Sequence, residues 1–192
     1  FTRSTAHKVS AAMVSLLLAV SIGNTAVAQI ARTGDVVSLR DGLVTMLQQE
    51  GAAKMQKVTV SVDQATADSL LGVHGLEMGG TFTVYKGQTA EGGVMGSVVV
   101  LGEEGKEGPL QVLVALRPDG AIYDIGFTVF GEDKGKPALQ WPYLRQFLGK
   151  SANDPLTLGD DVDGVSGATW TSTSVSHAIK KAAVIYDTFV RH

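Results

Sequence analysis

Cysteine is absent from this chain of 192 residues. Its absence excludes disulfide bonds, iron–sulfur clusters held by thiolates, and haem attached covalently through a Cys-x-x-Cys-His motif. Any redox chemistry must therefore come from another kind of cofactor. Histidine is also scarce, and the histidines lie too far apart for the paired spacing of metal ligands, so we expect no metal site. They are His7, His74, His177 and His192.

Long basic runs are missing as well. The net charge is -3 and charged residues make up 18% of the chain. Neither nucleic acid nor a lipid surface bound through a polybasic patch is therefore an expected partner. No Gly-x-Gly-x-x-Gly motif follows a predicted strand, so nothing indicates a nicotinamide site.

The N-terminal residues 1–32 differ from the rest. Arg3 and Lys8 precede an apolar run over residues 9–23, and the small residues before Gln29 are typical of a signal-peptide cleavage site. Residues 11–28 are also barely long enough to cross a bilayer, so a retained membrane anchor is the alternative. Both interpretations place residues 33–192, the expected single domain, outside the cytoplasm, because the basic residues precede the apolar run.

Hydrophobic periodicity predicts the secondary structure of this domain. Apolar residues at helical spacing predict helices over 35–50, 64–71, 139–148 and 172–190. Branched and aromatic residues predict strands over 57–62, 81–85, 94–101, 110–116 and 122–130. Because these strands follow one another through short turns, we expect an α+β fold with a mainly antiparallel β-sheet packed with helices.

Two further segments have simple interpretations. The charged segment 103–109 is predicted to be a solvated turn without a role in a site. Trp141 and Phe147, in the predicted helix 139–148, are expected to supply core burial rather than cofactor contacts.

A loop of small and hydroxylated residues comes directly before the last helix. The residues of interest are Asp163, Gly164, Ser166, Gly167, Ala168, Thr169, Trp170, Thr171 and Ser172. A helix N-terminus has unpaired backbone N–H groups and partial positive charge, so it favours an anion such as phosphate. Hydroxylated residues are also preferred helix caps, which is the simpler interpretation of the same residues.

Five positions of this loop, Asp163, Ser166, Gly167, Ala168 and Thr169, together with the Ala-rich helix that follows, resemble the flavinylation motif of the FMN-binding domain family. This family includes the C subunit of the sodium-translocating NADH:quinone reductase and the G subunit of the Rnf complex. The resemblance implies that Thr169 carries FMN through a phosphoester and that a separate flavin transferase attaches it. The C-terminal helix would then follow the flavinylation loop directly.

The resemblance also implies roles for neighbouring residues. Asp163 would serve recognition by the transferase, and Ser166, Gly167 and Ala168 would shape the loop. Further cofactor-binding candidates are Trp170, Thr171, Ser172, Glu132 and Gly135. The last two match a family loop that lies beside the flavin, although Asp133 stands where the respiratory subunits usually have threonine.

The function implied is that of an extracytoplasmic electron-transfer flavoprotein on the periplasmic side of a membrane, anchored by the N-terminal helix if that segment is not cleaved. We expect a carrier or redox subunit rather than a stand-alone enzyme, with membrane or extracytoplasmic redox partners. The alternative is a flavin-free structural or interaction subunit of a membrane protein complex with the same fold. A flavin-dependent reductase is disfavoured by the missing nicotinamide motif.

Overall fold

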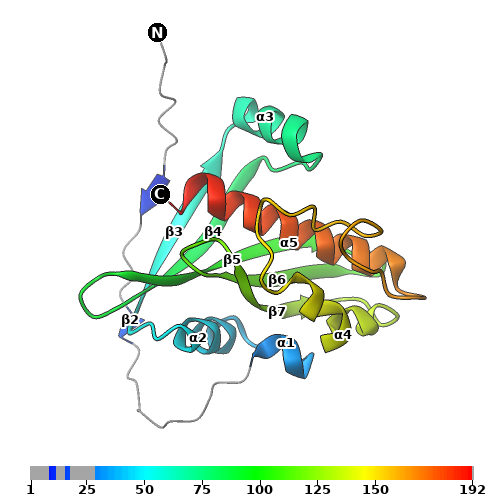
Figure 1. The fold of residues 1–192 in the computed structure, drawn as a ribbon, viewed down its shortest axis with the longest axis horizontal. Coiled ribbons are helices and arrows are strands. Elements are labelled where there is room, and N and C mark those ends of the chain that lie inside the picture. The colour runs from blue at the N-terminus through cyan, green and yellow to red at the C-terminus, as the bar shows by residue number, and fades with distance from the viewer. Residues whose placement is uncertain (1–8, 12–15, 18–28, 192) are drawn as a thin grey trace.

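The structure, a computed structural model, describes residues 9–11, 16–17 and 29–191 (Figure 1). Most of the expected signal peptide or anchor, residues 1–32, lies outside the described residues. Within the described ranges, no helix has both the length and the apolar character needed to cross a bilayer.

An antiparallel sheet forms the centre of the fold (Figure 1). Its long strands, in sequence order, are β3 (Lys54–Val62), β4 (Gly80–Gln88), β5 (Val94–Glu104), β6 (Pro109–Leu116) and β7 (Ile122–Phe130). Two short segments, β1 (Val9–Ala11) and β2 (Leu16–Leu17), pair with β3. All these pairings are antiparallel, so the predicted α+β class is confirmed.

Helices cover both faces of the sheet (Figure 1). The long helix α5 (Thr169–Phe189) packs on one face, and α1 (Ile30–Thr33) and α2 (Leu39–Gln49) pack on the other. Strand β6 contributes side chains to the cores on both faces of the sheet, because successive side chains of a strand point to opposite faces. Val112 and Val114 lie in the core beneath α5, whereas Leu113 and Ala115 lie in the core beside α2.

The first predicted helix, 35–50, begins later than expected, at Leu39. Residues before it are extended, because the Val37 N–H donates to the Phe127 carbonyl at 2.9 Å and so ties this segment to β7. Ser38 then caps α2 by accepting a hydrogen bond from the Asp41 N–H at 3.1 Å.

The second predicted helix is confirmed as α3 (Gln64–His74), which is capped by Asp63.

The predicted helix 139–148 is wrong as a single helix. The chain instead makes three short turns: η1 (Lys136–Leu139), α4 (Trp141–Leu144) and η2 (Arg145–Phe147). Pro137 and Pro142 lack a backbone N–H and each stands at the start of a turn, which divides the segment. Phe147 is fully buried as predicted, whereas Trp141 is half-buried, with the Arg32 guanidinium 4.3 Å from its ring centroid.

Candidate functional site

Helix α5 begins at Thr169, three residues earlier than the sequence predicts, so Thr169 is its first helical residue. Ala168 occupies the N-cap position, and no side chain caps the helix. This start differs from those of α2 and α3, which are capped by Ser38 and Asp63. The simple capping interpretation of the hydroxyl-rich loop is therefore wrong, and the first turn of α5 keeps N–H groups that are available to an anion.

The hydroxyl groups around this helix start have other partners. Thr171 donates to Glu132 Oε2 at 2.8 Å, and Ser172 Oγ accepts a bond from the Val165 N–H at 3.3 Å. Thr173 donates to the Thr169 carbonyl at 3.0 Å. Thr169 is exposed, and within the part of the chain that the structure describes its hydroxyl has no hydrogen-bond partner. Its oxygen is thus free to form a new bond.

Gly167 gives the loop its turn into the helix. Its φ angle is +79°, in the left-handed region that side chains rarely adopt, while nothing lies within 4 Å of the position where a Cβ would stand. The requirement for glycine here is therefore conformational rather than steric.

Glu132 joins three segments of the site. It follows β7, yet its side chain is only 3% exposed. One carboxylate oxygen accepts the Glu107 N–H at 2.6 Å, and the other accepts the Thr171 hydroxyl at 2.8 Å. The carboxylate thereby ties the β5–β6 turn to the start of α5.

The charge of Glu132 is stabilised in this position. Burial raises the pKa of Glu132, but the hydrogen bonds from the Glu107 N–H and the Thr171 hydroxyl outweigh it, so the pKa is lowered from its ordinary value. We therefore treat Glu132 as an ionised acceptor at neutral pH.

Gly135 provides the space for this contact. A Cβ added at Gly135 would stand 2.7 Å from Thr171 Cγ2 and 2.9 Å from Glu132 Cβ, closer than side-chain atoms pack. The predicted pairing of Glu132 with Gly135 in one site thus has a steric basis.

The substitution Gly135→Ala is expected to push Thr171 away from Glu132 and to destabilise the protein by about 1–3 kcal/mol, as overpacking does. Urea unfolding measures this change. Gly72→Ala is the matched control, because Gly72 lies in α3 with nothing within 4 Å of its Cβ position. There alanine should stabilise the helix by about 0.5–1 kcal/mol. Equal stability of the two variants would contradict the steric role of Gly135.

A cavity of about 280 Å³ opens at the start of α5. It brings together seven of the predicted cofactor-binding residues: Glu132, Gly135, Gly167, Ala168, Thr169, Trp170 and Thr171. Trp170 is 62% exposed at this cavity. Of the other predicted residues, Ser172 is fully buried, and Asp163 and Ser166 line a separate groove.

The cavity also contains residues that the sequence analysis missed: Lys106, Glu107 and Lys134. The first two belong to the segment predicted to be a solvated turn. Strand β5 continues to Glu104, beyond the predicted end at residue 101. This extension places the turn after β5 beside α5. There the Ser174 hydroxyl donates to the Glu104 carbonyl at 3.2 Å. No signal in the turn itself indicates this contact.

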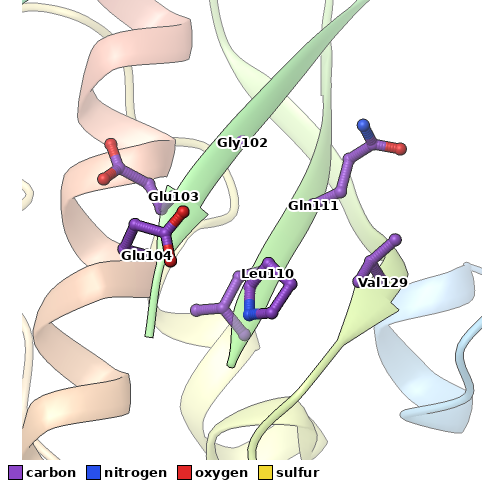
Figure 2. A pocket seen from close by; sticks show the side chains of 7 residues that line it. Gly102, Glu103, Glu104, Leu110, Gln111 and Val129 are labelled. Atoms are coloured by element: carbon purple, nitrogen blue, oxygen red, sulfur yellow. The ribbon is translucent and has the colours of Figure 1, made fainter. Parts of the chain in front are cut away.

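A second hollow, of about 390 Å³, lies at the ends of β5, β6 and β7 (Figure 2). Its lining residues are Gly102, Glu103, Glu104, Pro109, Leu110, Gln111 and Val129. None of them is a predicted site residue, so the cavity at the start of α5 remains the candidate site.

Residues 105–184 match the sequence model of the FMN-binding domain. The predicted resemblance to the FMN-binding domain family is confirmed. All residues that line the cavity lie within this FMN-binding domain match, which supports FMN as the cofactor.

Among solved structures, the chain is similar to NqrC of Shewanella oneidensis, with 23% sequence identity and a TM-score of 0.47. The match covers 61% of this chain and 63% of NqrC, less than two thirds of either. No curated protein matches the chain.

Proposed function

We propose that the chain is an extracytoplasmic electron-transfer protein that carries FMN covalently on Thr169. The observation that carries the proposal is the Thr169 hydroxyl, which is exposed and unpaired among the described residues. It lies at a cavity inside the stretch that matches the FMN-binding domain.

The residues of the cavity suit the phosphate end of FMN. The uncapped first turn of α5 offers N–H donors and partial positive charge, and Lys106 and Lys134 line the same cavity. Its volume of about 280 Å³ is near the lower limit of ligand pockets, about 300–1,000 Å³. Part of a bound FMN would therefore stay accessible to a redox partner.

Attachment requires an activated flavin, because the phosphate of free FMN has no good leaving group. A flavin dinucleotide supplies one. The Thr169 oxygen forms a bond to the phosphorus of the FMN half, the pyrophosphate bond to the AMP half breaks, and AMP leaves. The hydroxyl proton passes to a base of the transferase or to solvent. This chain presents the hydroxyl, and the isoalloxazine ring of bound FMN supplies the electron-transfer chemistry.

The location and partners belong to the same proposal. The segment before α1 contains a signal peptide or an anchor, and the domain lies outside the cytoplasm. The domain includes α1 (Ile30–Thr33), because this helix packs on the sheet. A flavin transferase is required for maturation. Electrons pass between FMN and membrane or extracytoplasmic redox proteins, because the chain shows no motif for a nicotinamide donor of its own.

Intact-protein mass spectrometry of the full chain, produced in a host with a flavin transferase, tests the proposal. The expected result is a single FMN adduct that peptide mapping places on Thr169, together with a yellow colour. A colourless protein of plain sequence mass, despite an active transferase, would favour the flavin-free interaction subunit.

Ser166→Ala is expected to slow FMN loading several-fold without abolishing it. Ser166 lines the groove on the loop rather than the cavity, so its hydroxyl is not the bonding atom. The time course of adduct formation with purified transferase measures the effect. Complete loss of the adduct at long times would contradict this secondary role.

A further inference from the structure

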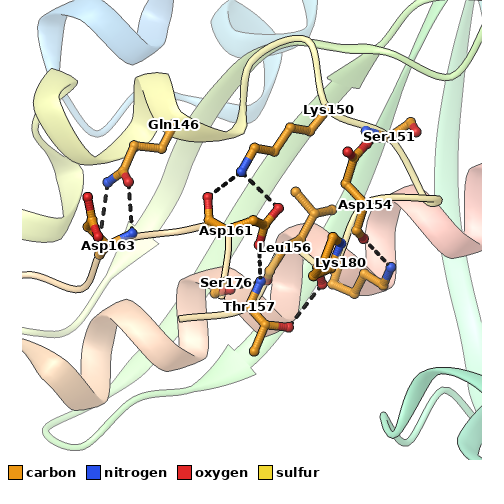
Figure 3. Close-up of polar contacts among 11 residues, drawn as sticks. Gln146, Lys150, Ser151, Asp154, Leu156, Thr157, Asp161, Asp163, Ser176 and Lys180 are labelled. Atoms are coloured by element: carbon orange, nitrogen blue, oxygen red, sulfur yellow. Dashed lines mark hydrogen bonds and ion pairs between the residues drawn. The ribbon is translucent and has the colours of Figure 1, made fainter. Parts of the chain in front are cut away.

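The connector before the flavinylation loop, residues 150–162, is held by side chains from two directions (Figure 3). From α5, Lys180 donates to the carbonyls of Ala152 and Asp154 at 2.7 and 2.6 Å. At the start of the connector, Lys150 Nζ lies 2.8 Å from Asp161 Oδ2. The flavinylation loop therefore follows a connector that these contacts hold in place.

Asp161 and Asp163 differ in what their carboxylates contact. Asp161 also accepts the Thr157 N–H at 2.9 Å. Burial raises the pKa of Asp161, but Lys150 and the Thr157 N–H outweigh it and lower the pKa overall. Asp163 is exposed, and among the described residues its carboxylate has no partner. The Asp161 carboxylate thus stabilises the connector, whereas the Asp163 carboxylate is free to contact another protein.

Gln146, in η2, holds the backbone of Asp163 at two points (Figure 3). Its amide nitrogen donates to the Asp163 carbonyl at 3.1 Å, and its amide oxygen accepts the Asp163 N–H at 2.8 Å. Two residues later, the Val165 N–H donates to Ser172 Oγ. The backbone of the loop is therefore fixed on both sides of Gly164, while the Asp163 carboxylate stays free.

A groove of about 490 Å³ runs beside this contact. Its lining includes Arg145, Gln146, Asp163 and Ser166, and it shares no lining residue with the cavity at Thr169. We propose that the flavin transferase engages the loop through this groove, and that Gln146 is a positioning residue which presents the Asp163 carboxylate to it. This inference rests on the proposed function of Thr169.

The chemistry of the partner supports this assignment. An enzyme that binds the pyrophosphate of a flavin dinucleotide must carry cationic groups or a metal ion beside it. Such groups are complementary to a free carboxylate six residues before the acceptor hydroxyl. Fixing the Asp163 backbone in advance removes the entropy cost of ordering the loop when the transferase binds.

Steady-state loading of the full chain, with purified flavin transferase and flavin adenine dinucleotide, tests the role of Gln146. In Gln146→Ala the loop is in its binding-competent form only part of the time. The KM for the acceptor protein should then rise about tenfold, while kcat changes little. Gln64→Ala is the matched control, because Gln64 is an exposed glutamine on α3 whose amide bonds Asp68. It should load like the unmodified sequence. An unchanged KM in Gln146→Ala would overturn the proposal.

A double-mutant cycle with Asp163→Asn keeps the test valid even if Gln146→Ala loosens the fold. If Gln146 acts by presenting the Asp163 carboxylate, the KM of the double variant should exceed that of Asp163→Asn by less than twofold. If the KM of the double variant instead rises by the product of the two single-variant increases, the proposal is overturned. Failure of the unmodified sequence to accept FMN would instead reject the proposed function itself, so the two failures are distinguishable.

Discussion

Thr169→Ala should abolish covalent FMN while the protein stays folded. The substitution removes the oxygen that we propose bonds to the FMN phosphorus. Because Thr169 is exposed and its hydroxyl has no partner among the described residues, the free energy of unfolding should change by no more than about 0.5 kcal/mol. Intact mass after exposure to transferase and flavin dinucleotide measures the loading, and urea unfolding measures the stability.

Two control variants isolate the hydroxyl. Thr169→Ser keeps an oxygen at the same position and should retain the adduct. Thr173→Ala removes a hydroxyl one helical turn away, which donates to the Thr169 carbonyl, and should also retain it. An adduct that persists in Thr169→Ala would contradict the assignment. Peptide mapping would then identify the true acceptor, with Ser166 and Thr171 as the first residues to inspect.

The strands of the fold were predictable because their signals are local. The alternation of Val58, Val60 and Val62 indicates a strand with one buried face, and all three are buried in β3. The double-sided burial of β6 was not predictable. Its continuous apolar run is equally typical of any buried strand, and only the tertiary structure shows that α2 covers the second face.

The candidate site was predictable only where its residues are close in sequence. The loop at Thr169 and the segment of Glu132 and Gly135 each carry recognisable residues. Their meeting depends on the path of the chain between β7 and α5, where the sequence analysis wrongly predicted a single helix over 139–148. Lys106 was missed because its place in the cavity depends on the length of β5, and Gln146 was missed because its bonds to Asp163 span 17 positions.

Glu132→Ala is expected to cause the largest loss of stability among the variants considered. It leaves the part-buried Glu107 N–H and the buried Thr171 hydroxyl without their acceptor. An unsatisfied buried donor costs about 1–3 kcal/mol and a part-buried one costs less, so a total loss of about 2–4 kcal/mol is expected. The turn at residues 105–108 should also separate from α5, which would slow FMN loading. Glu91→Gln, an exposed glutamate in the β4–β5 turn, is the control and should change stability by less than about 0.5 kcal/mol.

The pH dependence of the unfolding free energy separates the effect of the Glu132 charge from the effect of the space that Glu132→Ala leaves. Its pKa in the folded protein is lower than the ordinary value of about 4.3. Its stabilising contribution is therefore complete above that value and is lost as the pH falls through the folded pKa. Glu132→Gln has no proton to bind there, and its amide nitrogen would face one of the two donors. The difference in unfolding free energy between the unmodified sequence and Glu132→Gln should thus be constant near neutral pH and shrink below about pH 4. A difference that stays constant down to pH 2 would show that the carboxylate charge does not stabilise this contact.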